Sequence, residues 1–187
     1  MDNYNELTIV DELDKFIKYE TKVICDSLLN EMFSCSDFFD SMYIYNGNNY
    51  EHGNSFTELK SKFGIYFFFI NENIELSYKE IFEFNECASG GKFKRYMDTV
   101  LHKEDCLYLG SSTSESLYTR LNQHFDDKDS PASLHLSLKK RRILKRKVKI
   151  YAFPVKNKKI KNIDVLLKAI EKELHNIYKP LVGSNRV

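Results

Sequence analysis

The stretch Gly64-Ile-Tyr-Phe-Phe-Phe-Ile70 contains the longest apolar run in the chain. Aromatic and β-branched residues fill both of its alternating faces, which is typical of a central strand covered on both sides. The polar run Asn71-Glu-Asn73 ends it. A second run, Cys106-Leu-Tyr-Leu-Gly110, is also apolar on both faces and is followed by serines. We therefore predict two buried strands, near residues 64–70 and 106–110.

The segments that follow the second strand alternate between helical and strand patterns. Several potential N-caps at residues 111–114 precede a helical stripe that includes Leu117 and Phe125. The run Val148–Val155 is a third strand candidate, and Pro154 would place it at or near an edge of the sheet. Apolar residues at helical spacing predict a last helix over 163–178, which ends before the proline that follows.

The first third of the chain carries a different pattern. Apolar residues at intervals of three and four predict helix from residue 9 to about residue 33, with a break near 19–21. Turn-forming residues dominate 45–54, which we interpret as a loop. The chain thus divides into an acidic helical N-terminal extension, residues 1–55, and a second domain, residues 56–187. An insertion at about 71–105 holds a candidate strand at 81–84 and a short amphipathic segment at 93–101.

Charge is distributed unevenly along the chain. The 187 residues carry 28 Lys and Arg against 27 Asp and Glu, and the composition is that of a folded globular protein, not of a disordered tail or a disulfide scaffold. Residues 1–90 have a net charge of −11, whereas residues 91–187 have +12. A basic half of this size indicates a polyanionic partner, because lysine and arginine near phosphates release condensed counterions.

The short apolar runs, the acidic first residues and the spacing of the cysteines are those of an intracellular protein. No window approaches the roughly 20 uninterrupted apolar residues that a membrane span needs, and the first residues are acidic where a signal peptide would be basic. We therefore predict a cytoplasmic protein without membrane contact. The four cysteines form no C-x-x-C pair, so we interpret them as plain thiols: Cys25, Cys35, Cys87 and Cys106.

Short motifs follow the order of a known family. Gly64-Ile65-Tyr66 and Tyr108-Leu109-Gly110 are followed by Arg120 with His124 four residues later, by Glu171 nine residues before a proline, and by Asn185. From residue 64 to residue 185 this order resembles the GIY-YIG nuclease superfamily, and it looks closest to stand-alone bacterial members and their restriction-endonuclease relatives. The resemblance implies an α+β fold, in which helices flank a small, mainly antiparallel, three-stranded central sheet.

The resemblance also implies an arrangement of catalytic residues. Tyr66 and Tyr108 would lie on neighbouring antiparallel strands and face one pocket; one would orient or deprotonate a water, and the other would hold a phosphate oxygen. Arg120 presents a planar, permanently charged fork suited to a phosphate in its transition state. His124, one helical turn later, would share proton transfer or bind the phosphate. Positioning and electrostatics supply most of the rate in such a hydrolysis.

The resemblance assigns the metal ligand to the last helix. Glu171 would offer a hard oxygen to a single Mg²⁺ or Mn²⁺, which would stabilise the leaving 3′-oxygen. Glu173 competes for this role, but it points about 200° away on an ideal helix, and Glu171 reproduces the family's helix phase. Gly64, Gly110 and Asn185 would support the site. Many relatives have a lysine directly after the second motif's glycine, where this chain has Ser111; a lysine base would then come from Lys92 or Lys94.

The most basic segment lies between the predicted strand at 106–110 and the predicted helix at 163–178. Residues 139–161 contain twelve Lys or Arg and no acidic residue. A charge run of this kind is often only a solvated face, but next to a phosphodiesterase motif it becomes the best candidate for contact with the nucleic-acid backbone. His135, between leucines, is interpreted as a half-buried structural histidine. The nucleic-acid-binding candidates are Lys139, Lys140, Arg141, Arg142, Lys145 and Arg146.

These observations favour one function and leave two alternatives. The favoured function is metal-dependent endonucleolytic cleavage of DNA, with RNA and the choice between monomer and homodimer left open. The first alternative is a nucleic-acid-binding module that keeps the fold and has lost turnover. The second is an interaction domain in which the opposite charges of the two halves drive self-association. The acidic extension would be a packing appendage, an oligomerisation surface or a cover for the basic face.

Overall fold

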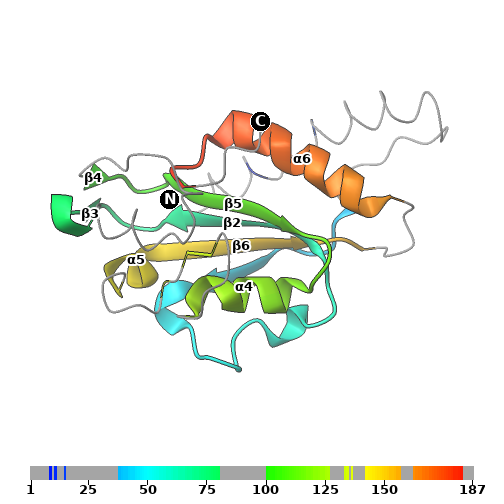
Figure 1. Cartoon of the computed structure of the whole chain (residues 1–187), viewed down its shortest axis with the longest axis horizontal. Helices are drawn as coiled ribbons and strands as arrows, with labels where there is room; N and C mark the ends of the chain where they lie inside the picture. Colours follow the sequence, from blue (N-terminus) through cyan, green and yellow to red (C-terminus); the bar gives the residue numbers. More distant parts are fainter. Residues whose placement is uncertain are drawn as a thin grey trace.

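A computed structural model describes the part of the chain that carries most of the predicted elements (Figure 1). The described residues are 38–80, 100–126, 133, 134, 136, 142–156 and 162–182, together with the isolated positions 9, 11 and 15. The strands are β1 (Tyr43–Asn46), β2 (Gly64–Ile70), β3 (Ile74–Glu75), β4 (Val100–Leu101), β5 (Cys106–Ser112) and β6 (Val148–Pro154). The helices are the short 3₁₀ turns η1 (Gly47–Asn49) and η2 (Thr57–Leu59) and the α-helices α4 (Leu117–Phe125), α5 (Arg142–Lys147) and α6 (Ile163–Tyr178).

The central sheet has four strands in the order β1-β6-β2-β5, and every neighbouring pair is antiparallel. The α+β class is confirmed, but the prediction of three strands is wrong. The additional strand, β1, falls partly inside the segment that we interpreted as a loop. Its residues alternate between half-buried and exposed, so it has no continuous apolar run. Since β1 pairs with β6, the sheet includes residues that the sequence assigned to the N-terminal extension.

Pro154 does not place β6 at an edge, because β6 lies between β1 and β2. The register of β1 along β6 ends at Ala152, and Pro154 is the last residue of β6. The lack of an N–H on the proline therefore removes no hydrogen bond from the paired part of β1 and β6. The carbonyl of Pro154 accepts a hydrogen bond from the Asp40 amide at 2.7 Å. The sequence predicted β6 at an edge of the sheet because β1 was not recognised. With β1 present, β6 is an interior strand.

Helices cover both faces of the sheet, which explains why β2 is apolar throughout (Figure 1). On one face Tyr66 and Phe68 pack in a core that includes the buried side of α4. On the other face Phe67 and Phe69 pack with the buried side of α6. All seven residues of β2 are buried. The predictions of a doubly covered central strand and of a last helix over 163–178 are confirmed.

The insertion is described only at its two ends. Strands β3 and β4 pair as a separate two-stranded antiparallel sheet, while residues 81–99, which include the candidate strand at 81–84, lie outside the described residues. Most of the N-terminal extension also lies outside them. Ile9 is an exception, because it is helical and its side chain is buried in the core that contains α6. Within the described part of the chain, no helix is both long and apolar enough to cross a membrane.

Candidate active site

The hydroxyl of Tyr66 is the meeting point of a buried polar cluster. Its strand, β2, directs the side chain to the face covered by α4, where the residue has no exposed surface. The hydroxyl oxygen lies 2.9 Å from His124 Nε2 and accepts a hydrogen bond from Arg120 Nε at 3.1 Å. Three of the residues predicted for the site are therefore brought together around one oxygen.

Helix α4 presents Arg120 and His124 from one face because they are four residues apart. The helix begins at the N-cap Ser116, whose hydroxyl accepts a hydrogen bond from the Thr119 amide at 3.1 Å. The cap therefore lies just beyond the predicted serine run at 111–114. The amide of Leu134 donates to His124 Nδ1 at 3.1 Å. Since a backbone N–H can only donate, Nδ1 is the acceptor nitrogen, and the neutral ring carries its proton on Nε2 and donates it to Tyr66.

Tyr108 joins the same cluster from the neighbouring strand. Its ring is stacked on that of Tyr66 with 6.1 Å between centroids, and its centroid lies 4.8 Å from that of His124. The register between β2 and β5 shifts between Phe68 and Phe69, next to the Tyr108 pairing position. Bulges of this kind redirect side chains and are common beside active sites.

Burial governs the ionisation of the two phenols. Burial raises the pKa of Tyr66 well above its usual value and also raises that of Tyr108. The charge of Arg120 opposes this rise in both pKa values, and the carboxylate of Glu171 adds to it. Burial acts to lower the pKa of Arg120, but the two phenols raise it overall. The cluster therefore consists of two neutral phenols beside a permanently charged guanidinium.

Glu171 approaches the cluster from the opposite side of the sheet, across the edge strand β5. Its Oε2 accepts a hydrogen bond from Ser111 Oγ at 2.5 Å, and its side chain is 31% exposed. His175, one turn later, places Nε2 3.9 Å from Glu171 Oε1 and 3.2 Å from the Leu109 carbonyl oxygen. Glu173 instead accepts a hydrogen bond from Asn176. Of the two candidate carboxylates, Glu171 is the one that contacts β5.

The environment of Glu171 fits a magnesium-type ion. The carboxylate is a hard donor that is half-exposed at a sheet edge, and Mg²⁺ in proteins commonly uses one or two carboxylates and keeps several waters. Among the described residues, no group of three or more His, Cys, Asp and Glu side chains is arranged to hold a metal. A single carboxylate with water ligands is the arrangement that these residues can supply.

Two supporting glycines are placed where a side chain would collide. A Cβ on Gly110 would lie 2.5 Å from the Tyr66 hydroxyl oxygen and 3.1 Å from Tyr108 Cε1. A Cβ on Gly64 would lie 2.0 Å from the Phe153 carbonyl oxygen. Gly110 lets the Tyr66 ring lie against β5, and Gly64 lets β2 approach β6. Asn185 lies outside the described residues.

The basic segment is described only in part. Residues 139–141 and His135 lie outside the described residues, and of Arg142 only the backbone is described. Lys145 and Arg146 lie on α5, where Lys145 Nζ is 5.0 Å from the centroid of the Tyr50 ring. Lys147 forms an ion pair with Glu72. The nucleic-acid role of these residues stays a prediction.

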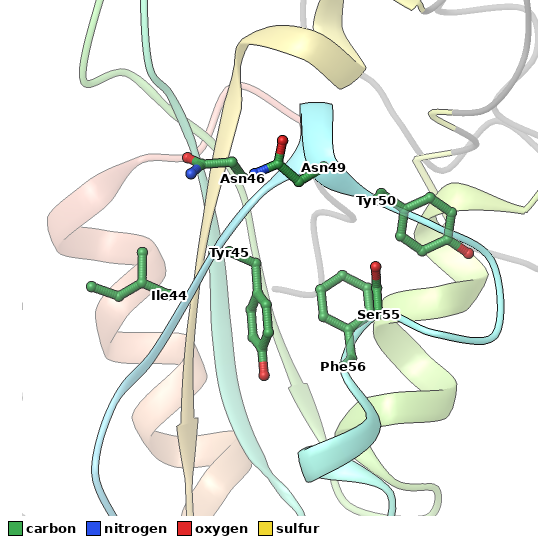
Figure 2. Close-up of a pocket in the computed structure, with 7 residues that line it drawn as sticks. All are labelled: Ile44, Tyr45, Asn46, Asn49, Tyr50, Ser55 and Phe56. Carbon is green, nitrogen blue, oxygen red and sulfur yellow. The ribbon is translucent and has the colours of Figure 1, made fainter.

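A cavity of about 180 Å³ lies beside Tyr50 (Figure 2). Tyr50 stacks on Phe125 of α4 with 4.1 Å between ring centroids and donates to Asn122 Oδ1 at 2.9 Å. None of the five predicted catalytic residues lines this cavity. Its lining consists of Ile44, Tyr45, Asn46, Asn49, Tyr50, Ser55 and Phe56.

The polar residues that support the cluster were not predicted. Gln123 accepts a hydrogen bond from Arg120, Glu115 accepts one from Gln123, and Ser111 donates one to Glu171. The contact of Gln123 with Arg120 could have been predicted, because Gln123 lies three residues after Arg120 and therefore on the same helical face. Glu115 and Ser111 had none, since their contacts depend on how α4, β5 and α6 pack.

We expect stability to fall at alkaline pH because of buried acids, three of which lie on β2 and β5. Burial raises the pKa values of Tyr66, Tyr108 and Cys106. The unfolded chain releases these protons near pH ~8.5 for cysteine and ~10 for tyrosine, whereas the folded chain keeps them. Their contribution is fully present below those values and falls as pH rises above them, by about 1.4 kcal/mol per pH unit for each group. Urea unfolding between pH 8 and 11 measures this, and a flat free energy of unfolding would contradict it.

Gly110→Ala is expected to lower the free energy of unfolding by about 1–3 kcal/mol, the usual cost of overpacking. The cause is the collision of the new Cβ with the Tyr66 hydroxyl oxygen at 2.5 Å and with Tyr66 Cζ at 2.8 Å. The cost should therefore be smaller when it is measured in a Tyr66→Phe background, which removes that oxygen. Urea unfolding of the two single variants and the double variant gives the coupling energy. Strict additivity would show that the collision is not the cause.

Comparison with known proteins adds one finding to this geometry. A family model described as the GIY-YIG catalytic domain matches residues 64–161, more than half of the chain. The matched region contains Tyr66, Tyr108, Arg120 and His124. No curated protein and no solved structure matches the chain. The match supports a nuclease-type function, and by its extent the chain belongs to the GIY-YIG catalytic domain family.

Proposed function

We propose that this chain is a metal-dependent endonuclease that hydrolyses phosphodiester bonds in DNA. The observation that carries the proposal is the convergence of Arg120 Nε and His124 Nε2 on the Tyr66 hydroxyl, at 3.1 and 2.9 Å. A fixed cation, an oriented imidazole and a phenol around one oxygen are the groups that phosphoryl chemistry needs. The family match supports the nuclease class, and DNA is the substrate that we propose.

The phosphodiester bond breaks when a water oxygen attacks phosphorus and the P–O3′ bond opens, which leaves a 5′-phosphate and a 3′-hydroxyl. Arg120 would bind the non-bridging oxygens, where negative charge is concentrated in the transition state. The Tyr66 hydroxyl accepts hydrogen bonds from Arg120 and His124, so its own proton is directed to a third partner. In the free protein that partner is the Tyr108 hydroxyl, which forms a hydrogen bond with Tyr66; we propose that a phosphate oxygen or the attacking water takes its place when DNA binds.

Glu171 is the residue that we propose as the metal ligand. When bound, Mg²⁺ or Mn²⁺ would stabilise negative charge on the leaving oxygen. The carboxylate is half-exposed at the edge of β5, and its electrostatic effect reaches both phenols. Ser111 orients one carboxylate oxygen by donating to it. Its neutral hydroxyl adds no charge that would compete with a cation.

Charge supports a polyanionic substrate. Residues 91–187 carry a net charge of +12 and include Tyr108, Arg120, His124 and Glu171. Backbone contacts from α5 and its basic surroundings would provide affinity without sequence information. We therefore propose that Lys145 and Arg146 contact the phosphate backbone. Binding should weaken steeply with salt, because each neutralised phosphate releases a counterion.

Conversion of supercoiled plasmid to nicked and linear forms tests this proposal. The wild-type protein is incubated with plasmid in Mg²⁺, in Mn²⁺ and in EDTA, beside Glu171→Ala and the matched control Glu173→Ala. We expect cutting only with metal, loss of cutting in Glu171→Ala and little change in Glu173→Ala, because only Glu171 contacts β5. Equal loss in both variants would refute the assignment of Glu171. DNA binding without cutting in either metal would instead favour the nucleic-acid-binding module.

A further inference from the structure

Gln123 connects Arg120 to an acidic side chain without letting the two charges touch. Arg120 Nη1 donates to Gln123 Oε1 at 2.8 Å, and Gln123 Nε2 donates to Glu115 Oε2 at 2.7 Å. The amide thus uses one atom for each neighbour. Among the side chains, only an amide presents an acceptor oxygen and a donor nitrogen side by side on one planar group.

We propose that Gln123 is a positioning residue that holds the Glu115 carboxylate one amide group away from the Arg120 guanidinium. The proposal rests on the phosphodiesterase function proposed above, in which Arg120 binds the reacting phosphate. A direct arginine–carboxylate contact is commonly bidentate and strong. Such a contact would occupy donors that the phosphate needs and would offset the charge that attracts it.

The position of Glu115 explains why a spacer is needed. Glu115 immediately precedes the N-cap Ser116, where the positive end of the helix dipole favours an acidic side chain. Its carbonyl oxygen accepts a hydrogen bond from Ser112 Oγ at 2.6 Å, which fixes the backbone at the end of β5. The start of α4 thus places a carboxylate close to Arg120, and Gln123 lies between the two groups.

The geometry of Arg120 also depends on this chain of contacts. The guanidinium forms a hydrogen bond with the Tyr108 hydroxyl, and it is also held by Tyr66 through Nε and by Gln123 through Nη1. These fixed contacts set both the position and the rotation of the planar fork. Loss of Gln123 removes one of them and allows Glu115 to move toward the guanidinium.

Four variants separate the effect of charge from that of packing. Gln123→Glu keeps the shape of the side chain but brings a carboxylate into direct contact with Arg120. Gln123→Ala removes the spacer. Each is also combined with Glu115→Gln. Plasmid cleavage kinetics give kcat and KM, and the 15N resonance of Arg120 Nε reports the environment of the guanidinium without any need for activity.

We expect Gln123→Glu to lower kcat/KM by about 100-fold, the scale of a misplaced reacting group. Gln123→Ala should lose about 10-fold, and adding Glu115→Gln should restore most of that loss, because no carboxylate remains to replace the spacer. The same addition should not rescue Gln123→Glu. The Arg120 Nε resonance should shift in Gln123→Ala and return toward its wild-type position in the Gln123→Ala/Glu115→Gln double variant.

Two results would overturn the spacer role. One is wild-type kcat/KM in Gln123→Glu; the other is failure of Glu115→Gln to improve Gln123→Ala, which would indicate a packing role only. If the wild-type protein binds DNA without cutting it, the proposed enzyme fails, but the spacer is still decided by the Arg120 resonance. In that case an unchanged resonance in Gln123→Ala would refute it.

Discussion

Arg120→Ala is expected to lower kcat for DNA cleavage by about 10³–10⁵-fold, the range found when an arginine that stabilises a phosphoryl-transfer transition state is removed. The guanidinium is a permanent cation that contacts the Tyr66 hydroxyl, and it influences both phenols of the cluster. Its loss removes the positive charge from the place where the phosphate would accumulate negative charge. Single-turnover cleavage of a labelled duplex at saturating protein measures this effect.

Arg120→Lys is the matched comparison for this prediction. It keeps a positive charge but loses the planar fork that bonds Tyr66 and Gln123 at the same time. We expect its activity to lie between those of wild type and Arg120→Ala. An alanine variant within about tenfold of wild type would contradict the role of Arg120, since general positioning effects alone exceed that value.

Tyr66→Phe is expected to reduce both activity and stability. The hydroxyl oxygen accepts from Arg120 Nε and lies 2.9 Å from His124 Nε2, and Tyr66 itself has no exposed surface. Removal of this oxygen leaves two buried donors without this acceptor, at a cost of about 1–3 kcal/mol in the free energy of unfolding. Loss of a group that positions the attacking water or the phosphate should lower kcat by about 10²-fold. Urea unfolding and single-turnover cleavage measure the two effects.

Tyr45→Phe is the control for this loss of a hydroxyl. The Tyr45 hydroxyl is buried and makes no hydrogen bond of good geometry among the described residues, although the nearby Glu58 carboxylate helps to raise its pKa. Removing a buried hydroxyl without such a bond should leave the free energy of unfolding unchanged or slightly higher. If Tyr45→Phe destabilises the protein as much as Tyr66→Phe does, the cost does not come from the Arg120 and His124 contacts.

The elements that were predicted correctly are those whose sequence shows apolar residues on one whole face or on both faces. Strand β2 is buried along its whole length and helix α6 has a single apolar face, so both carried strong patterns. Strand β1 was missed because only alternate residues are half-buried and asparagine and glycine follow it directly. Its absence from the prediction then made Pro154 look like an edge signal. One unrecognised strand therefore produced both errors in the sheet.

The candidate site was predictable to the extent that its residues lie at fixed spacing on regular elements. The structure brings Tyr66, Tyr108, Arg120 and His124 together, and Glu171 lies beside them at the edge of β5. The supporting contacts of Ser111 and Glu115 depend on how separate elements pack, which no local pattern encodes. Their contribution is orientation, and orientation is a property of the tertiary structure.

We propose that this cluster hydrolyses a phosphodiester bond by direct attack of water. Single-turnover cleavage of a DNA duplex in ¹⁸O-labelled water with Mg²⁺, followed by mass spectrometry of the product ends, tests it most directly. We expect 5′-phosphate ends that carry one ¹⁸O atom, 3′-hydroxyl ends without label, and no product from Arg120→Ala or Tyr66→Phe on the same timescale. Unlabelled 5′-phosphates, 3′-phosphate ends, or equal cleavage by those two variants would contradict it.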